Sequence, residues 1–106
     1  MANTFKNYFL KNANTTSQNV YSAGAGVSAT VIGMSIANTT ESPISANVSV
    51  YSAGQGYFMI QNATVAPGGA LVPVGGDQKL VLEAGDYMQV SSTGNTDVIV
   101  SVLEIT

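Results

Sequence analysis

The sequence predicts an all-β fold, either an antiparallel β-sandwich or a jelly-roll-like barrel of about seven or eight short strands. Three observations lead to this prediction. From about Val20 onward, apolar and polar residues alternate with a period of two. Clusters of Gly, Pro, Asn and Ser interrupt these runs at intervals of about 8–12 residues, as turns between short strands do. No stretch shows the 3.6-residue period of an amphipathic helix.

The N-terminal segment, residues 1–19, is predicted to be an arm or a first strand followed by a polar connector. It contains a cluster of large hydrophobic residues: Phe5, Tyr8, Phe9 and Leu10. Two interpretations of this cluster stay open. Its side chains fill the core of the domain itself, as most large apolar residues do, or they pack on a neighbouring subunit or partner. Residues 20–106 are expected to form a single β-sandwich domain.

The first clear run of strand residues extends from Ser28 to Asn38. Uninterrupted alternation places two sets of side chains on opposite faces of this strand. One set is Thr30, Ile32, Met34 and Ile36, and the other is Ala29, Val31, Gly33 and Ser35. Asn, Ser and Pro residues between positions 38 and 43 predict a loop at its end.

The next strand alternates over residues 44–51 and predicts one dry and one wet face. Its dry face carries Ile44, Ala46, Val48 and Val50, and its wet face carries Ser45, Asn47, Ser49 and Tyr51. Glycines within residues 52–56 predict a hairpin turn, and a further strand is expected over residues 57–65.

The C-terminal third predicts three shorter strands and one long one, separated by turns at residues 67–69, 75–77, 84–86 and 92–95. The strand at residues 70–74 contains Pro73 and is therefore expected at a sheet edge or in an irregular position. Strands follow at residues 79–83 and 87–91, the latter with Met88 and Val90 inward. The last strand, residues 97–105, is apolar on both faces. This pattern predicts that the strand lies centrally in its sheet or that another subunit covers it.

The composition argues against several classes of function. Only 8% of the residues are charged, the net charge is −3, and the chain has neither arginine nor histidine. A nucleic-acid-binding protein needs clustered cations, so no nucleic-acid partner is expected. The absence of His and Cys removes the usual nucleophilic and zinc chemistry, and we expect no catalytic residues, no cofactor and no metal. A weakly charged surface suits close packing against neighbouring subunits.

The remaining candidates for chemistry are acidic residues at turns. Asp77, Glu83 and Asp86 flank two turns, where a carboxylate pair or a calcium site is conceivable from residue type alone. Solvated turn anions are the simpler interpretation of these residues. No apolar run reaches the roughly 18 residues of a membrane helix, and residues 1–10 lack the apolar core of a signal peptide. No membrane association is expected.

The C-terminal half carries a recognisable pattern. It consists of residues 75–86 (GGDQKLVLEAGD), a short strand, a Ser/Thr/Gly/Asn turn and the ending SVLEI at residues 101–105. Together with residues 19–21 and 30–38, this pattern resembles small β-sandwich virion proteins of tailed bacteriophages, notably those of marine and cyanobacterial phages. The resemblance covers residues 20–106 and implies a virion component without catalytic residues.

The leading hypothesis is a capsid decoration, or cement, protein on the head surface that binds and stabilises the lattice of the major capsid protein. Open strand edges risk uncontrolled pairing, and closed symmetric assembly removes them, so a homotrimer is expected. The alternative is a tail, neck or fibre-associated module that binds other virion proteins or a host-surface glycan. Four tyrosines could stack on sugar rings in that case: Tyr21, Tyr51, Tyr57 and Tyr87.

Overall fold

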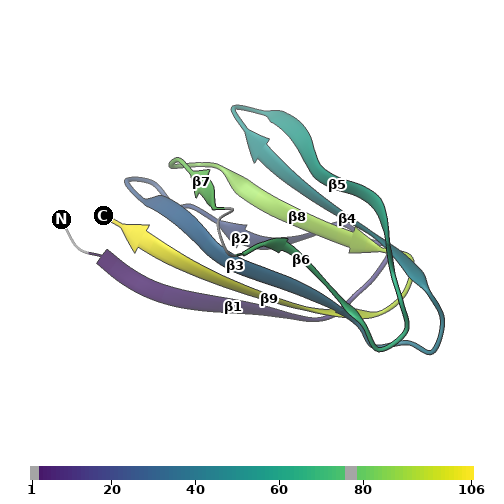
Figure 1. Cartoon of the computed structure of the whole chain (residues 1–106). Coiled ribbons are helices and arrows are strands. Elements are labelled where there is room, and N and C mark those ends of the chain that lie inside the picture. The colour runs from purple at the N-terminus through teal and green to yellow at the C-terminus, as the bar shows by residue number, and fades with distance from the viewer. Residues whose placement is uncertain (1–2, 76–78) are drawn as a thin grey trace.

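The computed structural model describes residues 3–75 and 79–106, which form nine strands connected by turns (Figure 1). The strands are β1 (Asn3–Ala13), β2 (Gln18–Ser22), β3 (Ser28–Asn38), β4 (Ile44–Ser52), β5 (Gln55–Val65), β6 (Ala70–Val74), β7 (Leu80–Leu82), β8 (Tyr87–Ser92) and β9 (Thr96–Ile105). The all-β prediction is confirmed, with more strands than the seven or eight expected. Strand β2 begins inside the segment predicted to be a polar connector.

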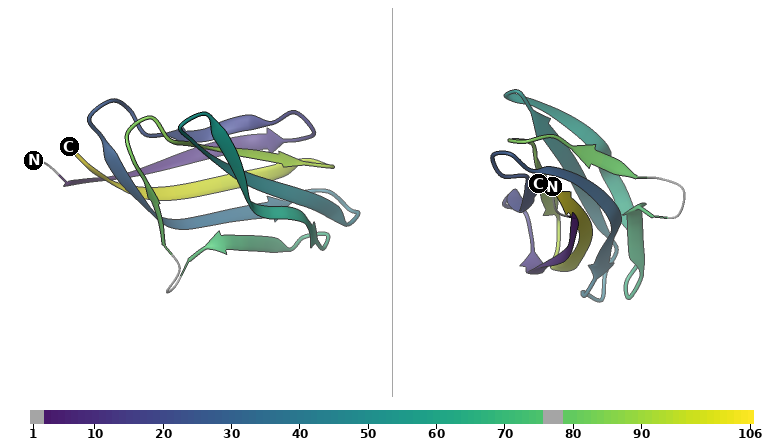
Figure 2. Two further views of the ribbon diagram at one scale, coloured as in Figure 1. Left: turned by 90° about the horizontal axis from the view of Figure 1, so that it is seen from above. Right: turned by 90° about the vertical axis from the view of Figure 1, so that its left-hand side faces the viewer.

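Two antiparallel sheets pack face to face, which makes the fold a sandwich (Figure 2). The first sheet has the order β1-β9-β3-β6, and β7 also pairs with β3. The second sheet has the order β2-β8-β4-β5. The long last strand β9 therefore lies between β1 and β3, as its two apolar faces predicted. The Pro73-containing strand β6 lies at an edge, also as predicted.

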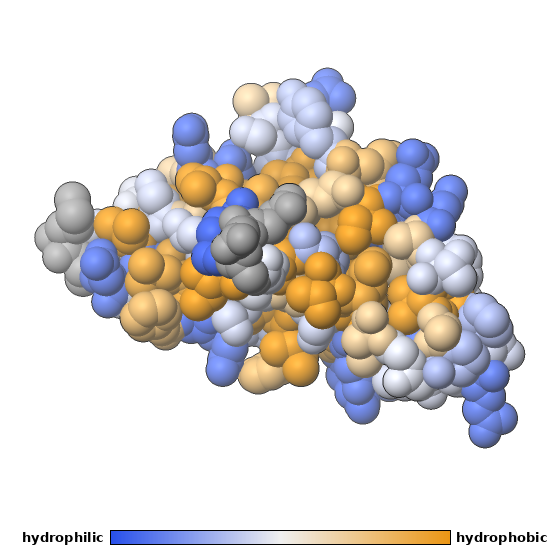
Figure 3. All heavy atoms as spheres, viewed as in Figure 1, coloured by the Kyte–Doolittle hydropathy of each residue, from blue (hydrophilic) through white to orange (hydrophobic). Residues whose placement is uncertain are grey.

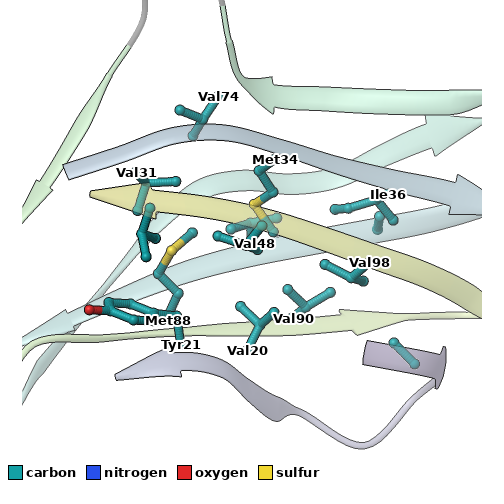
Figure 4. Close-up of a cluster of buried hydrophobic side chains, with 14 of the residues drawn as sticks. Val20, Tyr21, Val31, Met34, Ile36, Val48, Val74, Met88, Val90 and Val98 are labelled. Atoms are coloured by element: carbon teal, nitrogen blue, oxygen red, sulfur yellow. The ribbon is translucent and has the colours of Figure 1, made fainter. Parts of the chain in front are cut away.

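The core between the sheets is built mainly from Val, Ile, Met and Ala side chains (Figure 4). Strands β4 and β8 follow the predicted alternation, since Ala46, Val48, Met88 and Val90 are fully or almost fully buried. Val50 is only half-buried at the end of its strand. Each Å² of apolar surface removed from water contributes about 25 cal/mol to the free energy of folding. This buried layer is therefore the main source of stability.

Strand β3 departs from uninterrupted alternation. Val31 pairs with Val102 of β9, whereas Gly33 pairs with the adjacent residue Ser101, so Ile32 is an extra residue in β3. Such a β-bulge moves all following side chains to the opposite face. The core therefore receives Ala29 and Val31 before the bulge, and Met34 and Ile36 after it. The predicted grouping of Ile32 with Met34 and Ile36 on one face is wrong for this reason.

The predicted hairpin turn between β4 and β5 is present as a two-residue turn at Ala53 and Gly54. Their φ angles are 53° and 81°, the left-handed values that a type I′ turn requires. The predicted turn at residues 75–77 falls largely outside the described residues, and with it Asp77.

Asn38 at the end of β3 ties two loops to the sandwich. It is buried, and its side-chain amide donates hydrogen bonds to the carbonyl oxygens of Ser42 (2.8 Å) and Val65 (3.0 Å). Its Oδ1 accepts hydrogen bonds from the backbone N–H and the hydroxyl of Thr40. These four interactions satisfy the polar atoms of the buried Asn38 side chain.

Candidate interaction surface

The outer face of the first sheet exposes large apolar side chains. Because Val98, Val100 and Val102 of β9 point into the core, the intervening residues of this strand point outward. Phe5 and Phe9 of β1 share this face and are 73% and 66% exposed. We call this surface the apolar face. Its members on four strands are Phe5, Phe9, Ile32, Val81, Ile99 and Leu103.

The pairing register arranges these side chains in rows across the strands. One row runs from Phe5 through Leu103 to Thr30 and Val81, and a second runs from Phe9 through Ile99 to Ser35. In the space-filling view, hydrophobic residues gather across the middle of the molecule, over β3, β6 and β9 (Figure 3).

Between these rows lies a row of smaller residues, Asn7, Ser101 and Gly33. The surface is hollowed there, with an open volume of about 530 Å³ lined by Phe5, Lys6, Asn7, Ile32, Ser101 and Val102. A smaller hollow of about 190 Å³ lies beside Phe9 and Ile99. The apolar face therefore has ridges and grooves that a complementary surface could fill.

The outer face of the second sheet is different in character. Its middle is a ladder of small polar side chains on β2, β4 and β8. The amide of Gln89 donates to Asn19 (2.9 Å), and the amide of Asn47 donates to Ser91 (3.3 Å). Such a surface is well solvated, so the two outer faces of the sandwich are unequal in their tendency to associate.

The structure divides the N-terminal cluster into two pairs. Phe5 and Phe9 point outward on the apolar face, whereas Tyr8 and Leu10 pack partly buried against the core. The core interpretation therefore holds for Tyr8 and Leu10 but not for Phe5 and Phe9, whose packing on a partner stays a prediction. The period of two along β1 is the cause, since its side chains alternate between the two faces.

A charged cluster closes the core where β1, β2 and β9 meet. The Glu104 carboxylate accepts hydrogen bonds from the hydroxyl groups of Tyr21 (2.6 Å) and Tyr8 (3.4 Å). Its other oxygen lies 3.1 Å from the Lys6 ammonium. The rings of Tyr8 and Tyr21 meet edge to face with centroids 4.9 Å apart. No pattern in the sequence predicts this cluster, because Glu104 lies 83 and 96 positions from Tyr21 and Tyr8.

The pKa values in this cluster follow from its contacts. The Tyr21 hydroxyl, and after it Lys6, hold the pKa of Glu104 below its ordinary value, against the opposing effect of burial. Burial, and then donation to Glu104, raise the pKa of Tyr21. The neighbouring carboxylate raises the pKa of Lys6. A carboxylate held ionised in this way is a poor general acid at neutral pH, and its evident role is to hold three strands together.

Of the acidic residues at the turns, Asp86 has a structural contact. The Asp86 carboxylate accepts a hydrogen bond from the backbone N–H of Glu83 (3.0 Å) and so closes the turn before β8. Within residues 3–75 and 79–106, no three side chains from His, Cys, Asp and Glu come together as a metal site.

The four tyrosines considered as stacking platforms have different positions. Tyr21 is buried and cannot stack on a ligand. Tyr51 and Tyr87 are register partners on the second sheet, and their rings stack on each other, 4.9 Å apart and 6° from parallel. Tyr57 is 58% exposed on β5. No helix in the described part of the chain is long and apolar enough to cross a membrane.

No family model and no curated protein matches the sequence, but solved structures share the fold. One is a chain from Bacillus endospore appendages, a family of disulfide-linked pili, with a TM-score of 0.57 and 15% identity over 98% of this chain and 88% of that one. Another is a chain from the T13 IBDV viral particle, with a TM-score of 0.52 and 10% identity over 96% of this chain and 35% of that one. At such identities the similarity extends to the fold alone.

Proposed function

We propose that this chain is a non-enzymatic structural protein of a bacteriophage particle, a capsid decoration protein that binds and stabilises the major capsid protein lattice on the head surface. The observation that carries the proposal is the apolar face, which exposes ridges of Phe5, Phe9 and Ile99 to solvent. Contiguous apolar surface of this kind marks interaction sites on soluble proteins.

Two further observations support an assembled, structural role. The same sandwich fold occurs in chains of a pilus and of a viral particle, although fold by itself does not establish function. The middle of the opposite outer face is polar, with Phe58 and the stacked Tyr51 and Tyr87 rings on the same sheet. The apolar face is therefore the side that we assign to docking. In this arrangement β9 and β1 face the capsid and β4 and β8 face outward.

The test is cosedimentation of the purified protein with expanded capsids, followed by cryo-EM of the particle. We expect stoichiometric binding and density at regular positions on the head. Ile99→Asp places a charge at the centre of the apolar face and should weaken binding about tenfold or more, since burying an unpaired charge is costly. Phe58→Asp is the matched control, because Phe58 is 59% exposed on the second sheet and its substitution should leave binding unchanged.

The proposal is wrong if the head carries no copies, or if the two variants bind equally well. The alternative function, a tail, neck or fibre module that binds a host-surface glycan, has one supporting observation in the stacked Tyr51 and Tyr87 rings. Binding on a glycan array that is lost in Tyr87→Ala would favour it, together with density on the tail instead of the head.

A further inference from the structure

The outer edge of β1 has no strand partner in the described part of the chain, since β1 pairs with β9 alone. The register between these two strands is regular from Asn3 to Leu10. The other edges are short or interrupted. Strand β6 contains Pro73, β7 has three residues, and β2 and β5 both have register shifts. Strand β1 thus offers the longest uninterrupted edge for pairing with another strand.

We propose that two copies of this chain pair through their β1 edges, as antiparallel strands related by a two-fold axis at Asn7. This register places Asn7 opposite the partner's Asn7, Phe5 opposite the partner's Phe9, and Lys6 opposite the partner's Tyr8. Aromatic residues directly opposite each other stabilise antiparallel pairs. No two like charges face each other across the new strand pair.

Neighbouring registers are less favourable. Moving the axis to Lys6 places this cation directly opposite the partner's Lys6, which is destabilising. Moving it to Tyr8 places Phe5 opposite the partner's Lys11 and leaves one aromatic pair, Tyr8 opposite the partner's Tyr8, in place of two. Moving it by half a residue sets the apolar face of one copy beside the inward face of the other. Among these registers, the axis at Asn7 gives two Phe5–Phe9 pairs while it keeps the faces matched and the cations apart.

The pairing also joins the apolar faces of the two copies. The row that contains Leu103 and Phe5 in one copy continues into the partner's Phe9 and the partner's Ile99. By symmetry, a second row joins Ile99 and Phe9 of the first copy to the partner's Phe5 and the partner's Leu103. The row of Ser101 and Asn7 continues as a groove between the two ridges. Each Lys6 ammonium is already engaged by its own Glu104, so the closest cations across the axis are neutralised within their own copies.

This inference does not rest on the proposed function, because the pairing needs only the edge and register of β1. It predicts a two-fold dimer in place of the homotrimer expected from the sequence. Light scattering of the purified protein should give twice the mass of one chain, and a mass of one or three chains would overturn the inference.

The contact at the axis can be tested with single cysteines, because the chain contains none. Side chains directly opposite in an antiparallel pair have Cβ atoms roughly 5 Å apart, close to disulfide geometry. We therefore expect Asn7→Cys to form disulfide-linked dimers on mild oxidation. Asn3→Cys is the matched control. The proposed register separates the two copies of position 3 by eight residues of strand, roughly 27 Å, so this variant should stay unlinked.

The same register predicts that an equal mixture of Asn3→Cys and Lys11→Cys proteins forms mixed dimers. Failure of Asn7→Cys to cross-link, or equally fast cross-linking of Asn3→Cys alone, would overturn the proposed register.

Charged pairs test the Phe5 and Phe9 contact. Phe5→Lys combined with Phe9→Lys places like charges opposite each other and should weaken dimerisation at least about tenfold. Phe5→Lys combined with Phe9→Glu changes the same exposed positions but places opposite charges together, and should retain the dimer. Equal loss of dimer in both variants would show that the two positions do not face each other and would contradict the inference.

Discussion

At the scale of single residues, Glu104 is the clearest example of a buried charge with a structural task. Three donors from β1 and β2 surround its carboxylate. Removing one partner of such a group costs more than the hydrogen bond itself is worth, because the remaining charge stays buried without compensation. The cluster thereby fixes the strand that carries Phe5 and Phe9 on the sheet and holds the apolar face in place.

The lowered pKa of Glu104 predicts how stability depends on pH. Since folding favours the ionised form, its contribution is present above the ordinary pKa of 4.5 and is lost as the pH falls through the lower folded value. We expect thermal unfolding of Glu104→Gln to show a shallower loss of stability below about pH 4.5 than the unchanged protein shows.

Two further variants calibrate this result. Asp97→Asn removes an exposed carboxylate paired with Lys11. Because solvent screens that pair, the loss of stability at acid pH should change less in this variant than in Glu104→Gln. Tyr21→Phe should lower stability at neutral pH by about 1.5–3 kcal/mol through loss of a hydrogen bond to a charged group. If Glu104→Gln and the unchanged protein lose stability equally as the pH falls, ionised Glu104 does not stabilise the fold as described.

At the scale of elements, the β-bulge at Ile32 decides which residues of β3 reach the core. Before the bulge, odd-numbered residues such as Ala29 and Val31 are buried, and after it, even-numbered ones such as Met34 and Ile36 are buried. Bulges of this kind also increase the local twist and bend the strand. Here the bulge sets Ile32 at the border of the larger hollow on the apolar face.

Deletions test this role of the bulge. Deleting Ile32 removes the extra residue and keeps both halves of β3 in register with β9, so the protein should fold with a modest loss of stability. Deleting Ser35 instead moves one half of the strand to the wrong face and should abolish cooperative unfolding. Circular dichroism and thermal melts of both variants give the comparison, and equal tolerance of the two deletions would contradict the register of β3 against β9.

At the scale of the whole molecule, the low charge determines how the protein should associate. The chain has three cations and six anions, and of the cations Lys6 and Lys11 are paired with carboxylates of their own chain. Surfaces of this kind are attracted to partners by apolar burial and hydrogen bonding and only weakly by long-range electrostatics.

We therefore expect salt to have little effect on association. Dimerisation and capsid binding should change less than about threefold between about 0.05 and about 0.5 M sodium chloride, since the chain has only three cations and six anions. Sulfate, which strengthens apolar association, should tighten both. Sedimentation at several salt concentrations measures the effect, and a steep fall in affinity with sodium chloride would indicate an electrostatic interface instead.

The sequence by itself determined the strands from β3 onward and where most of them turn, because alternation and turn residues act locally. A central place in its sheet was one of two interpretations of the apolar faces of β9, and Pro73 indicated an edge or an irregular position for β6. The structure shows β9 between two strands and β6 at an edge. What only the tertiary structure decided depends on residues far apart in the chain. The bulge at Ile32 arises from pairing with β9, and the Glu104 cluster joins residues 83 and 96 positions apart. The division of the N-terminal cluster into outward Phe5 and Phe9 and inward Tyr8 and Leu10 likewise required β1 to pair along β9, since alternation separates two faces but does not say which one meets the core.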